Sequence, residues 1–428
     1  MNQPSAIERA GQAPARPQVV ILGAGFGGLS AATALRHAAV DITLIDRRNY
    51  HLFQPLLYQV ATAGLSPAQI ASPIRRIVAP QKNITVFMDK IIAIDKTAGE
   101  VVTSTRRIHF DYLIVATGAR HAYFGHDQWE EFAPGLKKIE DATEIRRRIL
   151  LAFEQAEATT DENERRRLQT FVVVGGGPTG VEMAGAIAEL AHRTILRDFR
   201  HINPAETKII LVEAGGRVLP AFPEKLSLSA AKQLGRLGVT VMTDAPVTDC
   251  HQDGITLQDG RRIETATIIW AAGVMASPAG KWLNAQCDKA GRVIVDAALR
   301  LPGFDNIFVI GDTAAVTDGN GVVAPGIAPA AKQMGYFAAA SILADIKGKP
   351  REKFRYRNYG NLATIGRSSA VADFGRFTLS GFPAWVIWCF AHIWFLIGFR
   401  NRLIVFLDWI VAYVSFERGA RLITGDEN

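Results

Sequence analysis

Two glycine-rich segments share one spacing and could bind phosphate groups. They read GAGFGG at residues 23–28 and GGGPTG at residues 175–180. In a G-x-G-x-x-G loop the first glycine permits a tight turn, the second lets the backbone approach a pyrophosphate, and the third allows close packing of helix and strand. A single match could be a chance glycine-rich turn, but two matches argue against that reading. We predict two dinucleotide sites, lined by Gly23, Gly25, Gly27, Gly28, Gly175, Gly177, Thr179 and Gly180.

An acidic residue ends the apolar run that comes after each loop. Asp46 closes DITLID and follows Gly23 at close to the spacing of about 20 residues expected for a carboxylate that binds a ribose hydroxyl. Glu213 closes KIILVE but lies farther from its loop, so we expect an extended helix or an insertion at residues 198–206. A carboxylate here repels a 2′-phosphate and favours NADH over NADPH, although Arg217 nearby weakens that inference. The alternative for both carboxylates is an ordinary solvated strand end.

Two dinucleotide sites in one chain imply electron transfer between two cofactors, and a flavin with a nicotinamide is the economical pair. The cysteines exclude a disulfide as the acceptor. A redox pair needs two sulfurs close together, as in C-x-x-C, whereas Cys250, Cys287 and Cys389 are far apart. We expect all three to be buried, unreactive thiols. The nine histidines and three cysteines show no metal-ligand spacing, so no metal is predicted.

The elements that must position these loops are alternating strands and helices. Residues 18–22 (QVVIL) and 170–174 (TFVVV) are apolar and β-branched, as in buried parallel strands, and alanine-rich helical sequence follows each loop. The sequence therefore predicts an α/β fold with two Rossmann-like dinucleotide-binding domains.

Composition and charge limit the remaining classes. The chain has 428 residues, enough for two or three domains, and its net charge of +7 suits an anionic membrane surface or a nucleic acid by arithmetic alone. The sequence matches no nucleic-acid module, so a nucleic-acid partner is not expected. Residues 1–16 are polar and rich in Ala and Pro without an apolar core, which predicts a disordered tail, not a signal peptide, and a cytoplasmic protein.

The C-terminal region is apolar and aromatic. Residues 383–399 and 403–416 are two apolar runs, each shorter than the roughly 20 residues that a spanning helix needs. We predict two amphipathic helices lying in the plane of a membrane interface, with a buried dimer interface or a transmembrane hairpin as alternatives. The residues expected at the level of the lipid headgroups are Trp385, Trp388, Trp394, Trp409, Arg400, Arg402, Arg418 and Arg421.

At this point the residues resemble a known family. The run YHLFQPLLYQVATAGLSPAQIASPIR at residues 50–75 is similar to the signature of the type II NADH dehydrogenases, the single-subunit, non-pumping NADH:quinone oxidoreductases. Residues 111–119 (DYLIVATGA), 268–274 (IIWAAGV) and 306–316 (NIFVIGDTAAV) match elements of the wider class of two-dinucleotide flavoproteins. The resemblance covers nearly all of the chain after residue 17. It implies FAD and NADH as cofactors, a membrane quinone as acceptor, a homodimer, and a peripheral position on the cytoplasmic face of the inner (plasma) membrane.

The resemblance also implies roles for single residues. Asp312 would bind the ribityl or phosphate part of FAD, with a helix N-cap before Ala314 as the alternative. Glu182 would point toward the junction of flavin and nicotinamide as a catalytic residue that positions groups or handles protons, with a surface helix carboxylate as the alternative. Further cofactor contacts would come from Ala116, Thr117, Gly118 and Gly273.

The family's quinone element, A-Q-x-x-x-Q, corresponds to APAAKQ at residues 328–333. Gln333 is kept as the second catalytic candidate and would contact the quinone together with Ala328 and Lys332. Pro329 replaces the first glutamine and removes its amide, but proline is favourable at a helix start. The helix that follows would still present its positive end to the flavin.

The repeat predicts the order of the domains. FAD-binding sequence is expected at residues 17–140 and 290–350, with an NADH-binding domain at 141–289 inserted between them and a C-terminal membrane-associated region at 351–428 that opens with strands. The alternative function is a soluble NADH oxidase or a ferredoxin-type flavin reductase, which would share both folds but need no aromatic tail. A redox-sensing or structural flavoprotein is a further alternative, and sulfide:quinone reduction is disfavoured because it needs reactive cysteines.

Overall fold

The computed structural model describes residues 16–415 and 418–424. The predicted tail at residues 1–16 therefore lies outside the described residues except for Arg16. The chain forms two compact units. The first unit consists of Met1–Asn49, Ile74–Gly118 and Ala276–Tyr356, and the second of Tyr50–Pro73, Ala119–Met275 and Arg357–Asn428.

The first unit is built on a parallel five-stranded sheet with the order β20-β9-β1-β2-β5. Its strands are β1 (Gln18–Leu22), β2 (Asp41–Asp46), β5 (Ile84–Met88), β9 (Tyr112–Val115) and β20 (Ile307–Val309). Smaller elements are α4 (Ile74–Val78), the antiparallel strands β6 (Ile91–Asp95), β7 (Glu100–Thr103) and β8 (Arg107–His109), α9 (Ala279–Trp282), β19 (Val293–Ile294) and β21 (Ala314–Ala315).

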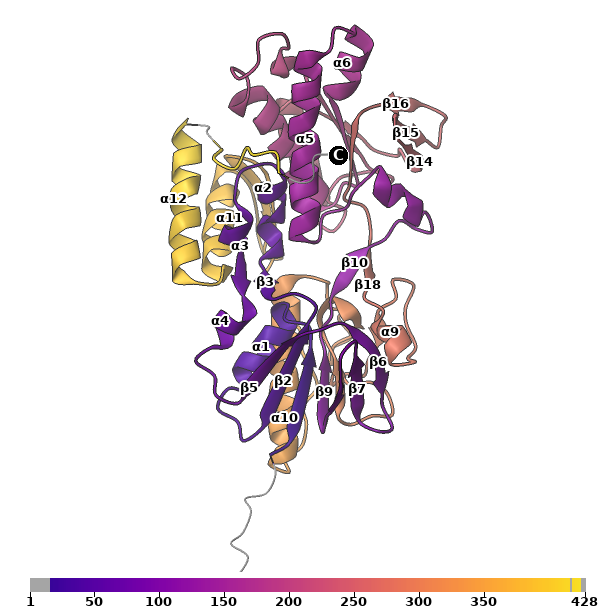
Figure 1. The fold of residues 1–428 in the computed structure, drawn as a ribbon, viewed down its shortest axis with the longest axis vertical. Helices are drawn as coiled ribbons and strands as arrows, with labels where there is room; N and C mark the ends of the chain where they lie inside the picture. Colours follow the sequence, from indigo (N-terminus) through magenta and orange to yellow (C-terminus); the bar gives the residue numbers. More distant parts are fainter. Residues whose placement is uncertain (1–15, 416–417, 425–428) are drawn as a thin grey trace, which may run out of the picture. The chain divides into compact units, whose positions relative to one another are not determined.

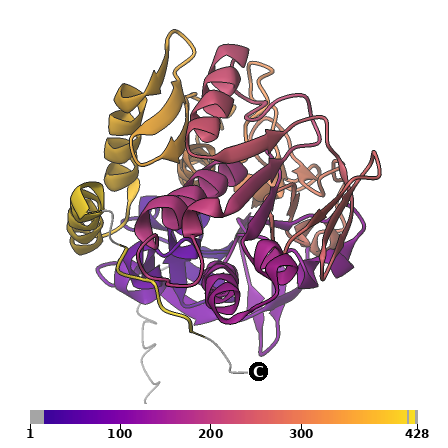
Figure 2. The ribbon, with the colours of Figure 1, turned by 90° about the horizontal axis from the view of Figure 1, so that it is seen from above.

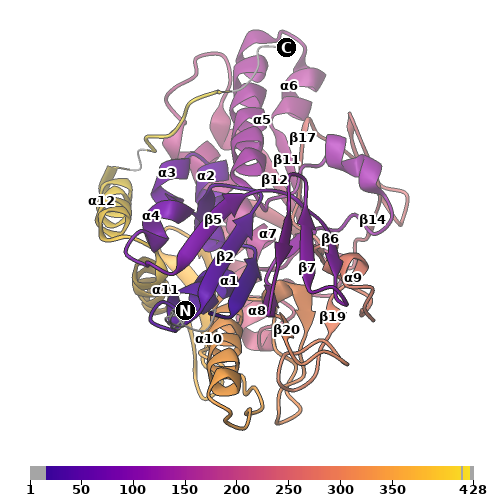
Figure 3. The same cartoon turned by 60° about the horizontal axis from the view of Figure 1, so that its bottom comes forward.

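Two helices of the first unit, α1 (Phe26–Ala34) and α10 (Ala328–Ile346), pack closely against each other beside this sheet (Figure 1; Figure 3). Glycine makes this contact possible, because a Cβ added at Gly335 would lie 2.2 Å from the carbonyl oxygen of Gly27. The close crossing holds the start of α10 near the start of α1, so both helix N-termini belong to one site.

The second unit contains a parallel four-stranded sheet with the order β13-β12-β11-β17. Its strands are β11 (Thr170–Val174), β12 (Lys208–Val212), β13 (Val239–Met242) and β17 (Thr267–Trp270). Around it lie α5 (Ile139–Ala158), α6 (Glu162–Leu168), α7 (Pro178–Glu189), α8 (Glu224–Arg236), and the antiparallel strands β14 (Val247–His251), β15 (Gly254–Leu257) and β16 (Arg262–Glu264).

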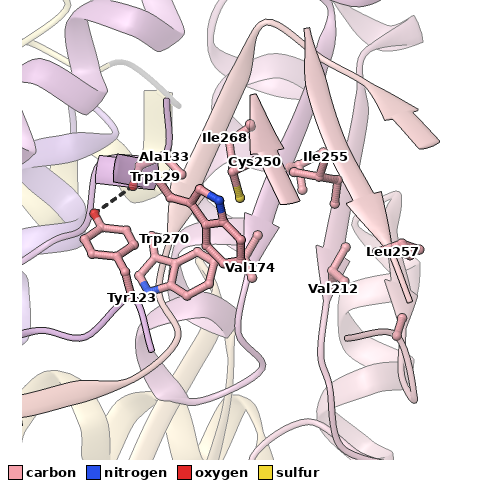
Figure 4. Close-up of a cluster of buried hydrophobic side chains, with 12 residues drawn as sticks. Tyr123, Trp129, Ala133, Val174, Val212, Cys250, Ile255, Leu257, Ile268 and Trp270 are labelled. Atoms are coloured by element: carbon pink, nitrogen blue, oxygen red, sulfur yellow. Dashed lines mark hydrogen bonds between the residues drawn. The ribbon is translucent and has the colours of Figure 1, made fainter. Parts of the chain in front are cut away.

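An aromatic cluster closes one part of this second core (Figure 4). The indole rings of Trp129 and Trp270 lie 5.5 Å apart between centroids, and the Tyr123 hydroxyl donates to the carbonyl oxygen of Ala133 at 2.8 Å. Cys250 is buried in the same cluster. These contacts are structural. The buried tyrosine and tryptophan donors each have a hydrogen-bond acceptor, and the Cys250 thiol is only weakly polar.

Further short elements, a small sheet and two terminal helices complete the second unit. Short elements are β3 (Tyr50–Leu52), α2 (Leu57–Ala61), α3 (Pro67–Ile70), β4 (Ala71–Pro73), β10 (Ala119–His121) and β18 (Val274–Ala276). An antiparallel sheet of β22 (Asn361–Gly366), β23 (Ser369–Asp373) and β24 (Thr378–Gly381) leads into α11 (Phe382–Phe395) and α12 (Phe399–Ser415). Figure 2 shows this sheet beside α11, with α12 next to it. The predicted strands and terminal helices of this region are both present.

The expected α/β class with two parallel sheets is confirmed. Among the described residues, neither terminal helix nor any other helix combines the length and apolar character that a membrane crossing requires.

Candidate functional site

The first glycine loop joins β1 to α1 and is closely packed at Gly23, Gly27 and Gly28. Gly23 has a φ of 97° and donates its N–H to the carbonyl oxygen of Ile45 at 2.8 Å. A Cβ at Gly28 would lie 1.8 Å from the carbonyl oxygen of Gly23, so the loop folds tightly onto the first turn of α1. At Gly25, by contrast, a Cβ would meet nothing within 4 Å. The open space therefore lies beside the second glycine, where a pyrophosphate would approach the helix N-terminus.

The second loop, between β11 and α7, repeats this geometry. Gly175 has a φ of 108°, a Cβ at Gly180 would lie 1.8 Å from the carbonyl oxygen of Gly175, and a Cβ at Gly177 would meet nothing within 4 Å. Thr179 follows in the first turn of α7. Both glycine loops, called cradles below, therefore fit a dinucleotide, since each leaves space at its second glycine, where the phosphates would lie.

The two predicted carboxylates bind the glycine loops. Asp46 accepts hydrogen bonds from the backbone N–H of Ala24 at 2.7 Å and of Arg48 at 2.8 Å. Glu213 accepts from the backbone N–H of Gly176 and, at 2.7 Å, from that of Gly215. Each carboxylate thus lies beside its cradle at the end of the second strand, which is where a ribose hydroxyl would bind.

The long interval between the second loop and Glu213 has two causes. Helix α7 continues through a π-helical turn at Leu190–Thr194, and a segment with a 3-10 turn at Pro204–Glu206 precedes β12. The helix is therefore extended and a connecting segment is added, as the spacing predicted. Arg217 donates to the carbonyl oxygen of Pro220 at 3.0 Å.

Residues 116–118 and the Gly-Asp pair meet beside the first cradle. A Cβ at Gly23 would lie 2.4 Å from the carbonyl oxygen of Ala116, and the N–H of Gly118 donates to the Thr313 hydroxyl at 2.8 Å. Thr117 and Ser277 share a hydrogen bond of 2.5 Å between their hydroxyl oxygens. The structure therefore brings the predicted FAD contacts of the first unit together.

Asp312 is half-buried within a 3-10 turn at Gly311–Thr313. The alternative role as a helix N-cap is wrong, because Ala314 begins strand β21 and no side-chain cap bond forms at this turn. A Cβ at Gly326 would lie 3.5 Å from Oδ1 of Asp312, which places this carboxylate near the segment leading into α10.

Helix α10 begins at Ala328 with Pro329 in its first turn, as expected for proline at a helix start. Its Met334 sulfur accepts the backbone N–H of Gly311 at 3.1 Å, so the start of α10 faces the Gly-Asp turn. Lys332 and Gln333 are half-buried on this helix. Their contact with a quinone stays a prediction.

Two further predicted residues of the second unit are Gly273 and Glu182. Gly273 is exposed after β17 with a φ of 74°, and the adjoining Ala272 approaches the second loop, since a Cβ at Gly175 would lie 2.7 Å from its backbone nitrogen. Glu182 is on α7, where Gly185 lets the helix touch β22: a Cβ there would lie 1.9 Å from the carbonyl oxygen of Ile365. As a result the backbone N–H of Thr364 donates to Glu182 at 3.4 Å.

Glu182 lines a cavity of about 110 Å³ within the second unit. Burial raises the pKa of the Glu182 carboxyl to about 8, and the hydrogen bond from Thr364 opposes this in part. The alternative of an ordinary surface carboxylate is therefore wrong. The other walls come from α2, β22, α11 and α12 and include Tyr58, Trp385, Trp388, Cys389 and Trp409.

A largely buried ion pair lines this cavity. Arg418, which follows α12, lies 3.4 Å from the Glu189 carboxylate and donates to the carbonyl oxygen of Thr62 at 2.7 Å. Burial raises the pKa of Glu189 and lowers that of Arg418, while the charge of each partner opposes the shift. The predicted contact of Arg418 with lipid phosphates is wrong, because its guanidinium is used inside the protein.

Helices α11 and α12 expose large apolar side chains. The exposed fractions reach 71% for Phe390, 73% for Trp394 and 80% for Phe399. The tryptophans do not all face outward as predicted: Trp388 is buried, and Trp385 and Trp409 are half-buried at the cavity. Arg421 also departs from the expectation, since it pairs with Asp198.

The cysteines differ in one respect from expectation. Cys250 is buried and Cys389 half-buried, and burial raises the pKa of each thiol to about 12. Cys287 is exposed, which contradicts the prediction of three buried thiols. Desolvation, together with the negative charge of Asp288, raises the pKa of the Cys287 thiol, so this thiol too stays protonated at neutral pH.

Sequence reasoning missed Tyr58, Glu189 and Arg418 as neighbours of Glu182. They come from segments far apart in the chain, so no local spacing connects them. The signal that could have found Tyr58 is its place within residues 50–75, the run that carries the family resemblance.

Comparisons with known proteins agree with this arrangement. The family model "Pyridine nucleotide-disulphide oxidoreductase" matches residues 17–335, and "NDH2 C-terminal domain" matches residues 359–416. The chain is 47% identical over 436 residues to the type II NADH:quinone oxidoreductase Ndh of Mycobacterium tuberculosis, covering 98% of this chain and 93% of that protein. It is 30% identical to the type II NADH:quinone oxidoreductase of Haemophilus influenzae, covering 83% and 86%.

Solved structures share the fold. NDH2 of Plasmodium falciparum in complex with NADH superimposes with a TM-score of 0.87 at 21% identity, over 96% of this chain and all of that one. The sulfide:quinone oxidoreductase of Aquifex aeolicus reaches a TM-score of 0.69 at 21% identity, over 92% and 95%. The chain has two nucleotide cradles, a match to the "NDH2 C-terminal domain" and a relative that is 47% identical along nearly its whole length. It therefore belongs to the type II NADH:quinone oxidoreductases.

Proposed function

We propose that this chain oxidises NADH and reduces a membrane quinone through FAD, without pumping protons. The observation that carries the proposal is the pair of cradles at Gly25 and Gly177, each open beside the second glycine and flanked by a strand-end carboxylate. Bound FAD would supply the chemistry that links a two-electron donor to a quinone. The first unit would hold FAD, and the second would hold NADH.

The residues of the chain would bind and orient the two dinucleotides. The helix N-termini of α1 and α7 face the pyrophosphates, and Asp46 and Glu213 accept hydrogen bonds from ribose hydroxyls. Asp312 and residues 116–118 would contact the rest of FAD. We assign FAD binding to residues 17–140 and 290–350, and NADH binding to residues 141–289. These bounds differ from the compact units, because residues 50–73 and 119–140 pack in the second unit and residues 276–289 in the first.

For the quinone, the chain offers two groups of residues. Ala328, Lys332 and Gln333 on α10 carry the family element, without its first glutamine. The cavity at Glu182 has aromatic walls, as a planar ring requires, and Glu182 would hold a proton at neutral pH because burial raises its pKa to about 8. Quinone reduction consumes protons, so a protonated carboxyl at this place suits the reaction.

The exposed apolar faces of α11 and α12 support attachment to a membrane. Their uncovered phenylalanines and tryptophans form the kind of surface that monomeric soluble proteins rarely expose. We assign a peripheral position at the cytoplasmic face of the inner (plasma) membrane and a homodimeric state. A soluble NADH oxidase or a ferredoxin-type reductase would have no use for this surface.

The proposal is tested by steady-state oxidation of NADH with the full chain, FAD and anionic phospholipid vesicles containing a prenylated quinone. NADH consumption that depends on the quinone, with quinol as the product in equal amount, supports it. Equal rates with and without quinone would point to an oxidase, and turnover with oxidised ferredoxin-type acceptors alone would point to the soluble reductase.

A further inference from the structure

Three side chains form a directed hydrogen-bond relay from α12 to the cavity at Glu182. The indole Nε1–H of Trp409 donates to Oε1 of Gln59 at 2.8 Å, and Nε2 of Gln59 donates to the Tyr58 hydroxyl oxygen at 2.9 Å. Tyr58 and Gln59 are neighbours on α2, and Trp409 comes from the middle of α12. All three line the cavity.

The direction of this relay is fixed by its first member. An indole N–H can only donate, so the amide of Gln59 must present its oxygen to Trp409 and its NH₂ group to Tyr58. The Tyr58 oxygen is therefore an acceptor in this relay. Its proton must point elsewhere, and within the described part of the chain no side chain or carbonyl accepts it.

An unused donor at this place calls for an acceptor in the cavity. Tyr58 is 6% exposed, and a buried hydroxyl proton without an acceptor costs free energy that a bound carbonyl oxygen would recover. Burial, together with the nearby Glu182 carboxyl, raises the pKa of Tyr58 well above its ordinary value. The phenol consequently stays a donor over the whole working pH range.

The cavity has the size and walls for one ring. Its volume of about 110 Å³ is below the roughly 300–1,000 Å³ of pockets that enclose a whole drug-sized ligand. Trp385, Trp388 and Trp409 line the cavity with apolar aromatic surface, against which the edge or face of a conjugated ring can pack. A quinone headgroup combines a ring of this kind with carbonyl acceptors.

We propose that Tyr58 is the residue that recognises the quinone, by donating its hydroxyl proton in a hydrogen bond to one quinone carbonyl oxygen, with its orientation set by Gln59 and Trp409. This inference rests on the proposed function, since it assigns the contact that the quinone, as the electron acceptor, would make with the chain. The hydrogen bond polarises the carbonyl and fixes the register of the ring in the cavity. A prenyl tail would leave toward α11 and α12, whose outer faces are apolar.

Tyr58→Phe tests this with the FAD-loaded full chain, because it removes one oxygen and keeps the ring. The probes are 2,3-dimethoxy-5-methyl-1,4-benzoquinone, which is a headgroup without a tail, and hexacyanoferrate(III), a soluble acceptor that has no carbonyl. Tyr123→Phe is the matched control, since Tyr123 is a second buried tyrosine of the same unit and donates to a backbone carbonyl outside the cavity.

We expect Tyr58→Phe to raise the Michaelis constant for the benzoquinone about tenfold and to leave the hexacyanoferrate rate unchanged. Quenching of tryptophan fluorescence by the benzoquinone, measured without NADH, should show the same tenfold weaker binding. Tyr123→Phe should change neither quantity. Unaltered benzoquinone binding in Tyr58→Phe, or an equal loss with both acceptors, would overturn the proposal.

Trp409→Phe provides a second variant if Tyr58→Phe does not fold. Without the indole N–H the Gln59 amide can turn and accept the Tyr58 proton, so benzoquinone binding should weaken, by less than in Tyr58→Phe. Binding as tight as in the unaltered chain would contradict the relay. Should the unaltered chain fail to reduce any quinone, the proposed function falls, while the fluorescence titration still decides whether Tyr58 holds the ring.

Discussion

Glu213 accepts a hydrogen bond from the backbone N–H of Gly176, the residue between the first and second glycines of the second loop. The carboxylate is thereby fixed beside the open cradle. Glu213→Ala should raise the Michaelis constant for NADH by about one order of magnitude or more, because hydrogen bonds to a charged group contribute about 1.5–3 kcal/mol. The FAD content should not change, since Glu213 belongs to the second unit. An NADH titration with an unaltered constant would show that this carboxylate does not bind the ribose.

Replacing two glycines of the second loop by alanine should have different effects, because the added methyl group meets different surroundings at each. Gly177→Ala places a Cβ in open space at an ordinary φ of −70°, so the protein should fold with unchanged stability and lose NADH affinity as the methyl meets the pyrophosphate. Gly180→Ala, by contrast, places a Cβ 1.8 Å from a carbonyl oxygen and should destabilise the fold itself. Thermal unfolding and NADH binding, measured on both variants, separate the two effects. Full NADH affinity in Gly177→Ala would place the nucleotide elsewhere.

Glu182 should make the stability depend on pH. The folded protein keeps the Glu182 proton up to its pKa of about 8, whereas the unfolded chain releases it near 4.5. Protons therefore favour the folded state, and the free energy of unfolding should fall as pH rises through this window. Glu182→Gln stays neutral and should lose this part of the decline.

Urea unfolding across the same pH window checks this expectation. Glu224→Gln serves as the control, because Glu224 is exposed on α8 of the same unit. Its stability should follow pH as in the unaltered chain. A Glu182→Gln variant with the same slope as this control would mean that the Glu182 carboxyl is ionised in the folded protein.

Membrane attachment should depend on the outer faces of α11 and α12. Phe390→Asp and Phe399→Asp each put a charge on a strongly exposed phenylalanine and should weaken binding to anionic phospholipid vesicles about tenfold or more, since burying such a ring is worth about 1.5–3 kcal/mol. Leu228→Asp on α8 changes another exposed apolar residue, which is 64% exposed, and should not weaken binding. Vesicle flotation measures all three, and equal binding of every variant would remove these helices from the attachment site.

The sequence could predict what local spacing encodes. The glycine loops, the strands before them, Asp46 and Glu213 all follow from residue order, because a turn, a strand end and a helix start are set by near neighbours. Both terminal helices were predictable for the same reason, since their apolar runs and flanking arginines are continuous in the chain.

The cavity could not be predicted, because its walls come from separated segments. Tyr58, Glu182 and Trp409 become neighbours only after α2, α7 and α12 pack together. The same packing explains the errors at Trp388 and Arg418, whose residue types suit a membrane interface but whose places are inside the protein. Cys287 was expected to be buried on residue type alone, but it lies exposed at the surface.

Electrons should pass from NADH through FAD to a quinone. The most direct test is anaerobic: NADH is added to the FAD-loaded protein while the flavin absorbance is followed, and the benzoquinone is added once the absorbance has fallen. NADH should bleach the flavin, and addition of the quinone should restore its full absorbance. A flavin that NADH does not bleach, or that stays bleached in the presence of the quinone, would contradict it.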